Sequence, residues 1–314
     1  MGEQAKKIGE KLEGYGEKLF SGFGWTELTR DKEIKCTRKG THKKRTHGID
    51  LLMSFWNPYL GGKQGIIVEC KNRKMAGITQ EKMNTWLNEL INTIECTQST
   101  EEMEDINLED TNLCTGMLLV HANDKFDGEK FNSYLHHMNV PNRRNPINIF
   151  VAGNNEINRW NSLRDKILKD YSDNFQFVYP SIEGSNKELG EFITVNQLFS
   201  KYVFAQNIRM QKHKKNGQEY FLPITQKLII FFDEITKESF EYMWSMYKAF
   251  QFQDAEEMVF VFYPRTQDDV QYVQENFLKV LKQIKQPIKS EDEEKISIDF
   301  IDNRALSPID TEGR

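Results

Sequence analysis

Hydrophobic positions in the first half of the chain change their period several times, and each change predicts an element. Apolar residues spaced by three and four positions predict a helix over residues 4–20, which Gly22 and Gly24 end. Further along, β-branched apolar runs predict strands, and a second helical pattern carries Trp86 on its apolar side. The expected strands cover residues 33–38, 49–55, 65–71, 116–121 and 147–153, and the second helix covers residues 75–96. The predicted order is therefore helix, three strands, helix, two strands.

The second half of the chain alternates regularly between strand and helix patterns. The expected strands are 227–232, 258–263 and 296–301, and the helices between them are 236–250 and 268–284. Because helical crossovers join parallel strands, this pattern predicts a mostly parallel sheet. A helix over residues 195–205 and a hairpin that turns at Asn216-Gly217 come before it. A stretch rich in Gly and Ser at 181–190 separates two expected α/β domains, residues 1–180 and 190–314.

Composition narrows the class of protein. Of 314 residues, 38% are hydrophobic and 28% are charged, which is typical of a folded globular chain. No apolar run approaches the roughly 18 residues of a membrane span, and no apolar stretch follows the N-terminus as in a secretory signal. We therefore expect a cytoplasmic protein that does not enter a membrane. The four cysteines form no CxxC pair and the histidines show no zinc spacing, so reduced thiols without a metal role are expected.

Charged residues interrupt the strand pattern at one place that suggests chemistry. Glu69 and Lys71 end an apolar strand and, being two apart, share one face. Asp50 lies on the preceding strand, and an antiparallel return would bring it beside Glu69. Two converging carboxylates favour a hard divalent cation, Mg²⁺ or Mn²⁺, with the backbone carbonyl of Cys70 as a further ligand. The simpler alternative is an exposed charge cluster at a sheet edge, as we expect for the Glu-x-Lys triplets at 33–35 and 293–295.

This arrangement resembles the PD-(D/E)xK nuclease superfamily, the restriction-endonuclease-like fold, through Asp50, Glu69 and Lys71 over roughly residues 8–170. It is most similar to the Mrr-like and Holliday-junction-resolvase-like branches. The resemblance implies an αβββαββ core and a Mg²⁺- or Mn²⁺-dependent endonuclease that cleaves DNA. It also implies an acidic residue on the first helix, at a set distance before a Gly-aromatic step. Glu13 stands at that distance from Gly24-Trp25, and Glu17 and Glu10 on the same helix face are the alternatives.

Basic residues crowd the segments on both sides of this constellation. They are Arg38, Lys39, Lys43, Lys44, Arg45, Arg73 and Lys74. Although the net charge of the chain is −5, such local clusters predict a groove that binds the phosphate backbone of DNA. A solvated basic loop is the alternative interpretation.

A two-domain nuclease without a nucleotide-binding motor motif resembles a restriction enzyme or the nuclease subunit of a bacterial antiphage defence system. That resemblance implies a second protein subunit that regulates the activity. Cleavage of both DNA strands would in addition require a homodimer. The C-terminal domain is then expected to serve recognition, regulation or assembly. Three alternatives stay open: a catalytically inactive module that binds nucleic acid, an interaction protein in which these charges are only surface, and a nuclease of the same fold directed at RNA or at junctions.

Overall fold

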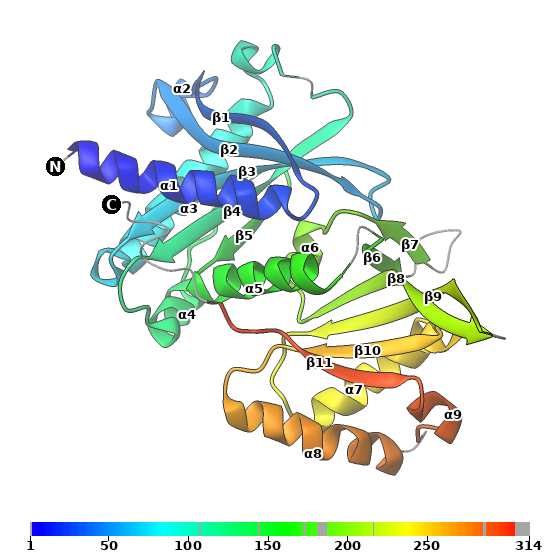
Figure 1. Cartoon of the computed structure of the whole chain (residues 1–314). Coiled ribbons are helices and arrows are strands. Elements are labelled where there is room, and N and C mark those ends of the chain that lie inside the picture. The colour runs from blue at the N-terminus through cyan, green and yellow to red at the C-terminus, as the bar shows by residue number, and fades with distance from the viewer. Residues whose placement is uncertain are drawn as a thin grey trace. The chain divides into compact units, whose positions relative to one another are not determined.

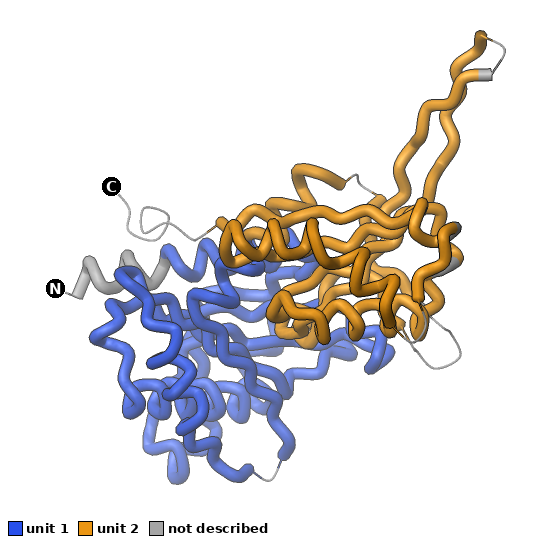
Figure 2. Tube along the Cα trace, turned by 90° about the horizontal axis from the view of Figure 1, so that it is seen from below, with its two compact units in different colours: residues 1–161, 305–314 blue, residues 162–304 orange. Residues whose placement is uncertain are grey.

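The computed structural model divides the chain into two compact units (Figure 2). Unit 1 covers residues 1–161 and unit 2 covers residues 162–304. The described residues are 2–106, 108–143, 145–171, 174–180, 187–215, 217–284 and 287–304. Each unit contains one β-sheet with helices packed on it, so the predicted α/β class is confirmed.

Among its described residues, unit 1 has a five-stranded sheet in the order β1-β2-β3-β4-β5 (Figure 1). The strands are β1 (Thr26–Lys35), β2 (Thr46–Asn57), β3 (Gly62–Arg73), β4 (Thr111–Ala122) and β5 (Asn148–Ala152). The first three strands pair antiparallel, whereas β4 runs parallel to both β3 and β5. Gly61, with a φ of 60°, makes the tight turn between β2 and β3. Each expected strand overlaps an observed one, and β1 differs most because it begins earlier, at Thr26.

Two long helices cover opposite faces of this sheet. On α1 (Gly2–Ser21), a Cβ added to Gly16 would lie 3.4 Å from Leu51 and 3.6 Å from Leu119. On the other face, α3 (Gln80–Thr97) approaches β4 so closely that a Cβ on Gly116 would lie 2.6 Å from Ile94. Gly116 and Leu119 are three apart on one strand and therefore face opposite sides.

Shorter helical segments complete unit 1. They are α2 (Lys39–His42), the 3-10 turns η1 (Met75–Gly77) and η2 (Glu101–Met103), α4 (Gly128–His136) and α5 (Asn154–Asp170), whose last residues belong to unit 2. The helix expected over residues 75–96 is thus split. Thr79 caps α3, since its hydroxyl accepts a hydrogen bond from the Lys82 N–H.

The sheet of unit 2 is mixed, which corrects the prediction of a mostly parallel one. In spatial order its described strands are β11 (Ile296–Phe300), β10 (Glu257–Phe262), β9 (Gln218–Phe231), β8 (Tyr202–Lys215), β6 (Gln176–Pro180) and β7 (Lys187–Gly190). The three strands β9, β10 and β11 are parallel, as expected, but β8 pairs antiparallel with β9 and β6, and β6 with β7. The error arose because one strand, β9, is both a hairpin arm and the first of the parallel strands.

The helices of unit 2 are α6 (Val195–Phe199), α7 (Lys237–Ala249), η3 (Phe252–Asp254), α8 (Gln267–Gln283) and α9 (Ser290–Glu293). The aromatic residues of α7 mostly face inward, where Phe240, Trp244 and Tyr247 join a core with Phe277 of α8. Tyr242 is the exception and is exposed. The helix expected over 195–205 ends at Phe199 because β8 begins at Tyr202.

The hairpin of β8 and β9 extends out of unit 2 (Figure 2). Residues 207–225 of this hairpin pair only with each other among the described strands, because β6 reaches Gln206 and β10 reaches Gln226. Gly217, with a φ of 80°, lies at the turn, and Asn216 falls outside the described residues. Met210 and Phe221 are exposed on its arms.

Unit 2 begins at residue 162, earlier in the chain than the domain boundary expected at 181–190. The reason is that β6 and β7, on either side of that stretch, both belong to the sheet of unit 2. Residues 181–186 themselves lie outside the described part. Of the helices formed by the described residues, none combines the length and the apolar character needed to cross a bilayer.

Candidate active site

The register of β2 and β3 brings the predicted residues to one end of the sheet. Leu51 pairs with Val68 in an antiparallel ladder, so the residue before Leu51 and those after Val68 lie together. The Asp50 carboxylate accepts a hydrogen bond of 2.7 Å from the backbone N–H of Cys70. The expected antiparallel return strand is therefore present, and it places Asp50 beside the Glu69–Lys71 segment.

Glu69 and Lys71 lie side by side on β3, and their side chains form an ion pair. β3 lies between β2 and β4, and Ile67 on the same face is part of the core under α3. As a result Glu69 is only 7% exposed. A charge cluster on an open surface, the simpler alternative from the sequence, does not describe a carboxylate at this depth.

Burial and mutual repulsion shift the acidity of this group. Burial, and after it the charge of Asp50, raises the pKa of Glu69 to about 7, although Lys71 acts in the opposite direction. Burial also raises the pKa of Asp50, against the effects of Lys71 and of the Cys70 N–H. Burial lowers the pKa of Lys71, but Glu69 and Asp50 outweigh it, so the net shift is upward. Two carboxylates thus share one ammonium in a poorly solvated place.

Cys70, between Glu69 and Lys71, points to the opposite face of the sheet. Its thiol is buried, and burial together with the charges of Asp50, Glu13 and Glu69 raises its pKa well above the usual range. The thiol is therefore protonated and unsuited to metal binding. The backbone carbonyl is what Cys70 can offer a cation, as the sequence suggested.

Of the acids considered on the first helix, Glu13 has a buried side chain, and the Cys70 thiol on which its charge acts lies on the face of the sheet opposite Glu69 and Lys71. Glu13 lies on α1, which packs against β3. Glu17 is half-buried and accepts a hydrogen bond from Ser21, with Arg30 at 3.9 Å. The side chain of Glu10 lies outside the described residues.

A further acid, Glu89 of α3, was missed from the sequence. Its charge raises the pKa of Asp50, Glu69 and Lys71, so it lies within electrostatic reach of all three. Its own partner is Lys44, at 2.6 Å. The available signal was its place directly before the core residue Leu90, at the edge of the apolar side of the helix. Helical periodicity alone does not say which sheet residues that edge will face.

The seven basic residues predicted to bind nucleic acid are all exposed. Those at 38–45 precede β2, whereas Arg73 ends β3 and Lys74 follows it, so both segments lie at the end of the sheet that carries Asp50 and Glu69. Two of the seven have acidic partners: Arg38 binds Glu95 at 2.9 Å and Lys44 binds Glu89. The structure thus brings the two basic segments to the acidic cluster.

The donor atoms at this place fit a hard divalent cation. Asp50 and Glu69 supply carboxylate oxygens and Cys70 supplies a carbonyl oxygen, and Mg²⁺ and Mn²⁺ prefer such ligands. Burial and the charge of Asp50 raise the pKa of Glu69, and a cation between the two carboxylates would act against both effects.

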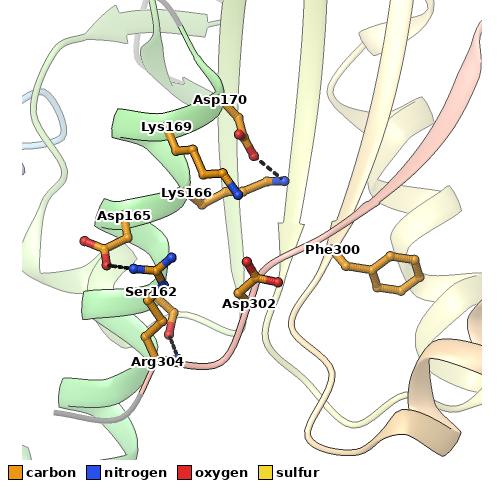
Figure 3. Close-up of a pocket in the computed structure, with 8 residues that line it drawn as sticks. All are labelled: Ser162, Asp165, Lys166, Lys169, Asp170, Phe300, Asp302 and Arg304. Carbon is orange, nitrogen blue, oxygen red and sulfur yellow. Dashed lines mark hydrogen bonds and ion pairs between the residues drawn. The ribbon is translucent and has the colours of Figure 1, made fainter. Parts of the chain in front are cut away.

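Unit 2 holds a separate charged hollow of about 130 Å³ between the end of α5 and the segment after β11 (Figure 3). Here Lys166 binds Asp170 and Asp299, each at 2.7 Å, and Arg304 reaches Asp165 at 3.4 Å. The Arg304 backbone N–H also donates to the Ser162 hydroxyl, at 2.8 Å. Because these acidic and basic side chains form ion pairs with one another, we interpret the hollow as a structural ion-pair cluster and not as a second reaction centre.

Comparison with known proteins agrees with the geometry of unit 1. Residues 1–156 match the family model described as the GAPS4 protein PD-(D/E)XK nuclease domain, a domain of the GAPS4 antiphage system. No curated protein and no solved structure matches the chain. Residues 1–156, which carry Asp50, Glu69 and Lys71 at the end of paired strands, are therefore identified as a PD-(D/E)XK nuclease domain.

Proposed function

We propose that this protein is a divalent-metal-dependent endonuclease that hydrolyses phosphodiester bonds of DNA in defence against phage. The observation that carries the proposal is the convergence of Asp50 and buried Glu69, with Lys71 ion-paired beside them. The match of residues 1–156 to a nuclease domain of an antiphage system supports both the chemistry and the setting.

Asp50, Glu69 and the Cys70 carbonyl are the groups that would hold Mg²⁺ or Mn²⁺. When bound, the cation polarises a phosphate oxygen and makes water more acidic. Glu13, buried on α1, adds an acidic group on the side of Cys70. Because Asp50, Glu69 and Cys70 lie on strands packed in the core, these oxygen donors are held in place.

Lys71 has a different part in the proposed reaction. Its pKa is raised, so the ammonium keeps its charge at neutral pH. A charged donor next to the carboxylates can bind a phosphate oxygen and stabilise the negative charge that develops during hydrolysis. The exposed basic residues at 38–45 and 73–74 would bind neighbouring phosphates and position the strand.

The experiment is cleavage of linear and circular plasmid DNA with Mg²⁺ or Mn²⁺ and with EDTA. Lys71→Ala should bind the metal but lose about 10²-fold or more in rate, as for removal of a charge-stabilising donor. Asp50→Ala and Glu69→Ala should lose metal binding as well, measured by titration calorimetry. The matched control is Lys63→Ala, which removes an exposed lysine from the other end of the same strand and should cleave normally.

Full activity of Lys71→Ala would overturn the proposed mechanism. Cleavage of RNA or of branched junctions in preference to duplex DNA would support the proposed active site but contradict the proposed substrate. DNA binding without cleavage under any metal would instead support a binding module.

We also propose that a second protein regulates the nuclease, because residues 1–156 match a nuclease domain of an antiphage system. Purification of the chain together with its co-encoded neighbours tests this. A stable complex or a change in cleavage rate supports regulation, and neither effect with any neighbour counts against it.

A further inference from the structure

Four buried side chains from distant parts of unit 1 converge at a place that the sequence did not single out. Cys36 directly follows β1, His42 ends α2, His47 lies on β2 and Cys96 lies in the last turn of α3. Their exposed fractions are 2%, 8%, 5% and 0%. One ligand atom from each lies within 4.8 Å of all the others. The cluster is separate from the carboxylates of the active site and offers sulfur and nitrogen in place of oxygen.

Four of the six distances between the ligand atoms of this cluster match a tetrahedron, and the other two, from His47 Nε2 to the sulfurs, are within 4.8 Å. A zinc ion with bonds of about 2.3 Å to sulfur and about 2.0 Å to nitrogen separates its ligand atoms by roughly 3.8 Å (S···S), 3.5 Å (S···N) and 3.3 Å (N···N). In the structure the two Sγ atoms are 3.8 Å apart. His42 Nδ1 lies 3.5 Å from Cys36 Sγ and 3.4 Å from Cys96 Sγ. It lies 3.4 Å from His47 Nε2. Four separations therefore agree with one central ion.

The surroundings orient the ligands as zinc sites require. The other ring nitrogen of His42, Nε2, lies 3.0 Å from the Glu95 carboxylate, which leaves Nδ1 directed at the cluster. Arg38 holds Glu95 in turn, at 2.9 Å. The Thr37 hydroxyl donates to Cys96 Sγ at 3.5 Å. A carboxylate behind a histidine ligand and a donor to a thiolate are the usual supports of a bound zinc ion.

We propose that Cys36, His42, His47 and Cys96 bind a structural Zn²⁺ ion. Two sulfurs and two nitrogens in a tetrahedron favour zinc over magnesium or manganese, and four protein ligands leave no open position for a substrate. A disulfide is the competing fate of the two thiols, but it would require a sulfur separation of about 2.0 Å and would leave both histidines buried beside it.

This ion would fasten the basic loop of the nuclease. Arg38, Lys39, Lys43, Lys44 and Arg45 all lie between the ligands Cys36 and His47. Cys96 connects the loop to α3, the helix that also carries Glu89 next to the active site. The Cys36 N–H further bonds the Arg45 carbonyl at 2.8 Å, which closes the loop at its base. The zinc ion would hold the phosphate-binding loop against a rigid helix.

The test is the metal content of the full-length protein, purified under reducing conditions and measured by inductively coupled plasma mass spectrometry. The wild type should contain about one zinc ion per chain, and Cys96→Ser should lose at least tenfold in occupancy. Cys114→Ser removes a thiol outside the cluster and should keep its zinc. Asp50→Ala should keep it too, because the proposed ion does not bind the carboxylates.

A second measurement decides the matter if Cys96→Ser does not fold. The wild-type protein exchanged with Co²⁺ should show the visible bands of tetrahedral cobalt and a near-ultraviolet thiolate band. Wild type that binds neither zinc nor cobalt would overturn the proposal. So would zinc that stays in folded Cys96→Ser but leaves in Asp50→Ala, or a Cys36–Cys96 disulfide in freshly purified protein.

Discussion

At the scale of single residues, the main feature of the site is that its carboxylates are poorly solvated. Burial, and the nearness of Glu69 and Asp50 to each other, makes their negative charges less favourable here than on a surface, although the ammonium of Lys71 lies beside them. In the proposed function, the stability of the metal-free protein and its affinity for metal would both depend on this buried acid.

The raised pKa of Glu69 leads to a pH-dependent prediction. Its folded-state pKa is about 7, above the usual 4.5, so the folded protein binds more protons in between. In EDTA, stability should therefore fall as pH rises from about 4.5 through about 7, by at least ~1 kcal/mol from this group. Glu69→Gln should remove that loss, as measured by urea unfolding at several pH values.

Metal binding should show the reverse dependence, because cation and proton compete for the same carboxylate. The Mg²⁺ affinity should weaken up to about tenfold per pH unit below pH 7 and level off above pH 8. Glu81→Gln, an exposed acid at the start of α3, is the matched control and should behave like the wild type. Equal pH profiles for Glu69→Gln and the wild type would show that the carboxylate is not buried as described.

At the scale of elements, the basic loop between β1 and β2 and the end of β3 belong to one surface. The antiparallel ladder brings the first part of β2 beside the last part of β3, so that Asp50 binds the Cys70 N–H although 20 residues separate them in the chain. Lys44 is engaged with Glu89 and Arg38 with Glu95, so part of the loop is held by acids of α3. Lys43, with a φ of 54°, and Arg45 are the exposed members to test.

The double substitution Lys43→Ala/Arg45→Ala should weaken DNA binding without changing the fold. If each residue contacts one phosphate, the slope of log affinity against log salt should fall by about 2. Fluorescence anisotropy with a labelled duplex at several salt concentrations measures it. Lys63→Ala/Lys279→Ala removes two exposed lysines elsewhere and should leave the slope unchanged. An unaltered slope in the loop variant would make the loop a solvated surface.

At the scale of the whole molecule, the described part of one chain holds one set of the proposed catalytic residues. A single set cleaves one strand at a time, whereas a homodimer presents two sets to a duplex. We therefore predict that the protein is a dimer when it cleaves, as light scattering coupled to gel filtration with DNA would show. Co-expression with excess Lys71→Ala chains should then change the main plasmid product from linear to nicked circular DNA. A monomer whose product stays linear under this dilution would contradict the prediction.

Helices, strands and other features that depend on neighbouring residues could be predicted from the sequence. Periods of two and of three to four residues predicted the order of helices and strands in unit 1, since those periods reflect local backbone geometry. The convergence of Asp50, Glu69 and Lys71 could also be predicted from the sequence, because two of them share one strand and the third lies on the adjoining hairpin arm. Such information is contained in short windows of the chain.

Contacts between residues far apart in the sequence depend on the tertiary structure. Glu89 reaches Asp50 and Glu69 because α3 crosses over the sheet, and Cys96 meets Cys36 and both histidines for the same reason. The mixed sheet of unit 2 likewise depends on β8 pairing with both β9 and β6, and hydrophobic periodicity does not specify partners. Local periodicity determines which face of an element is buried, whereas the packing of elements determines which residues that face will meet.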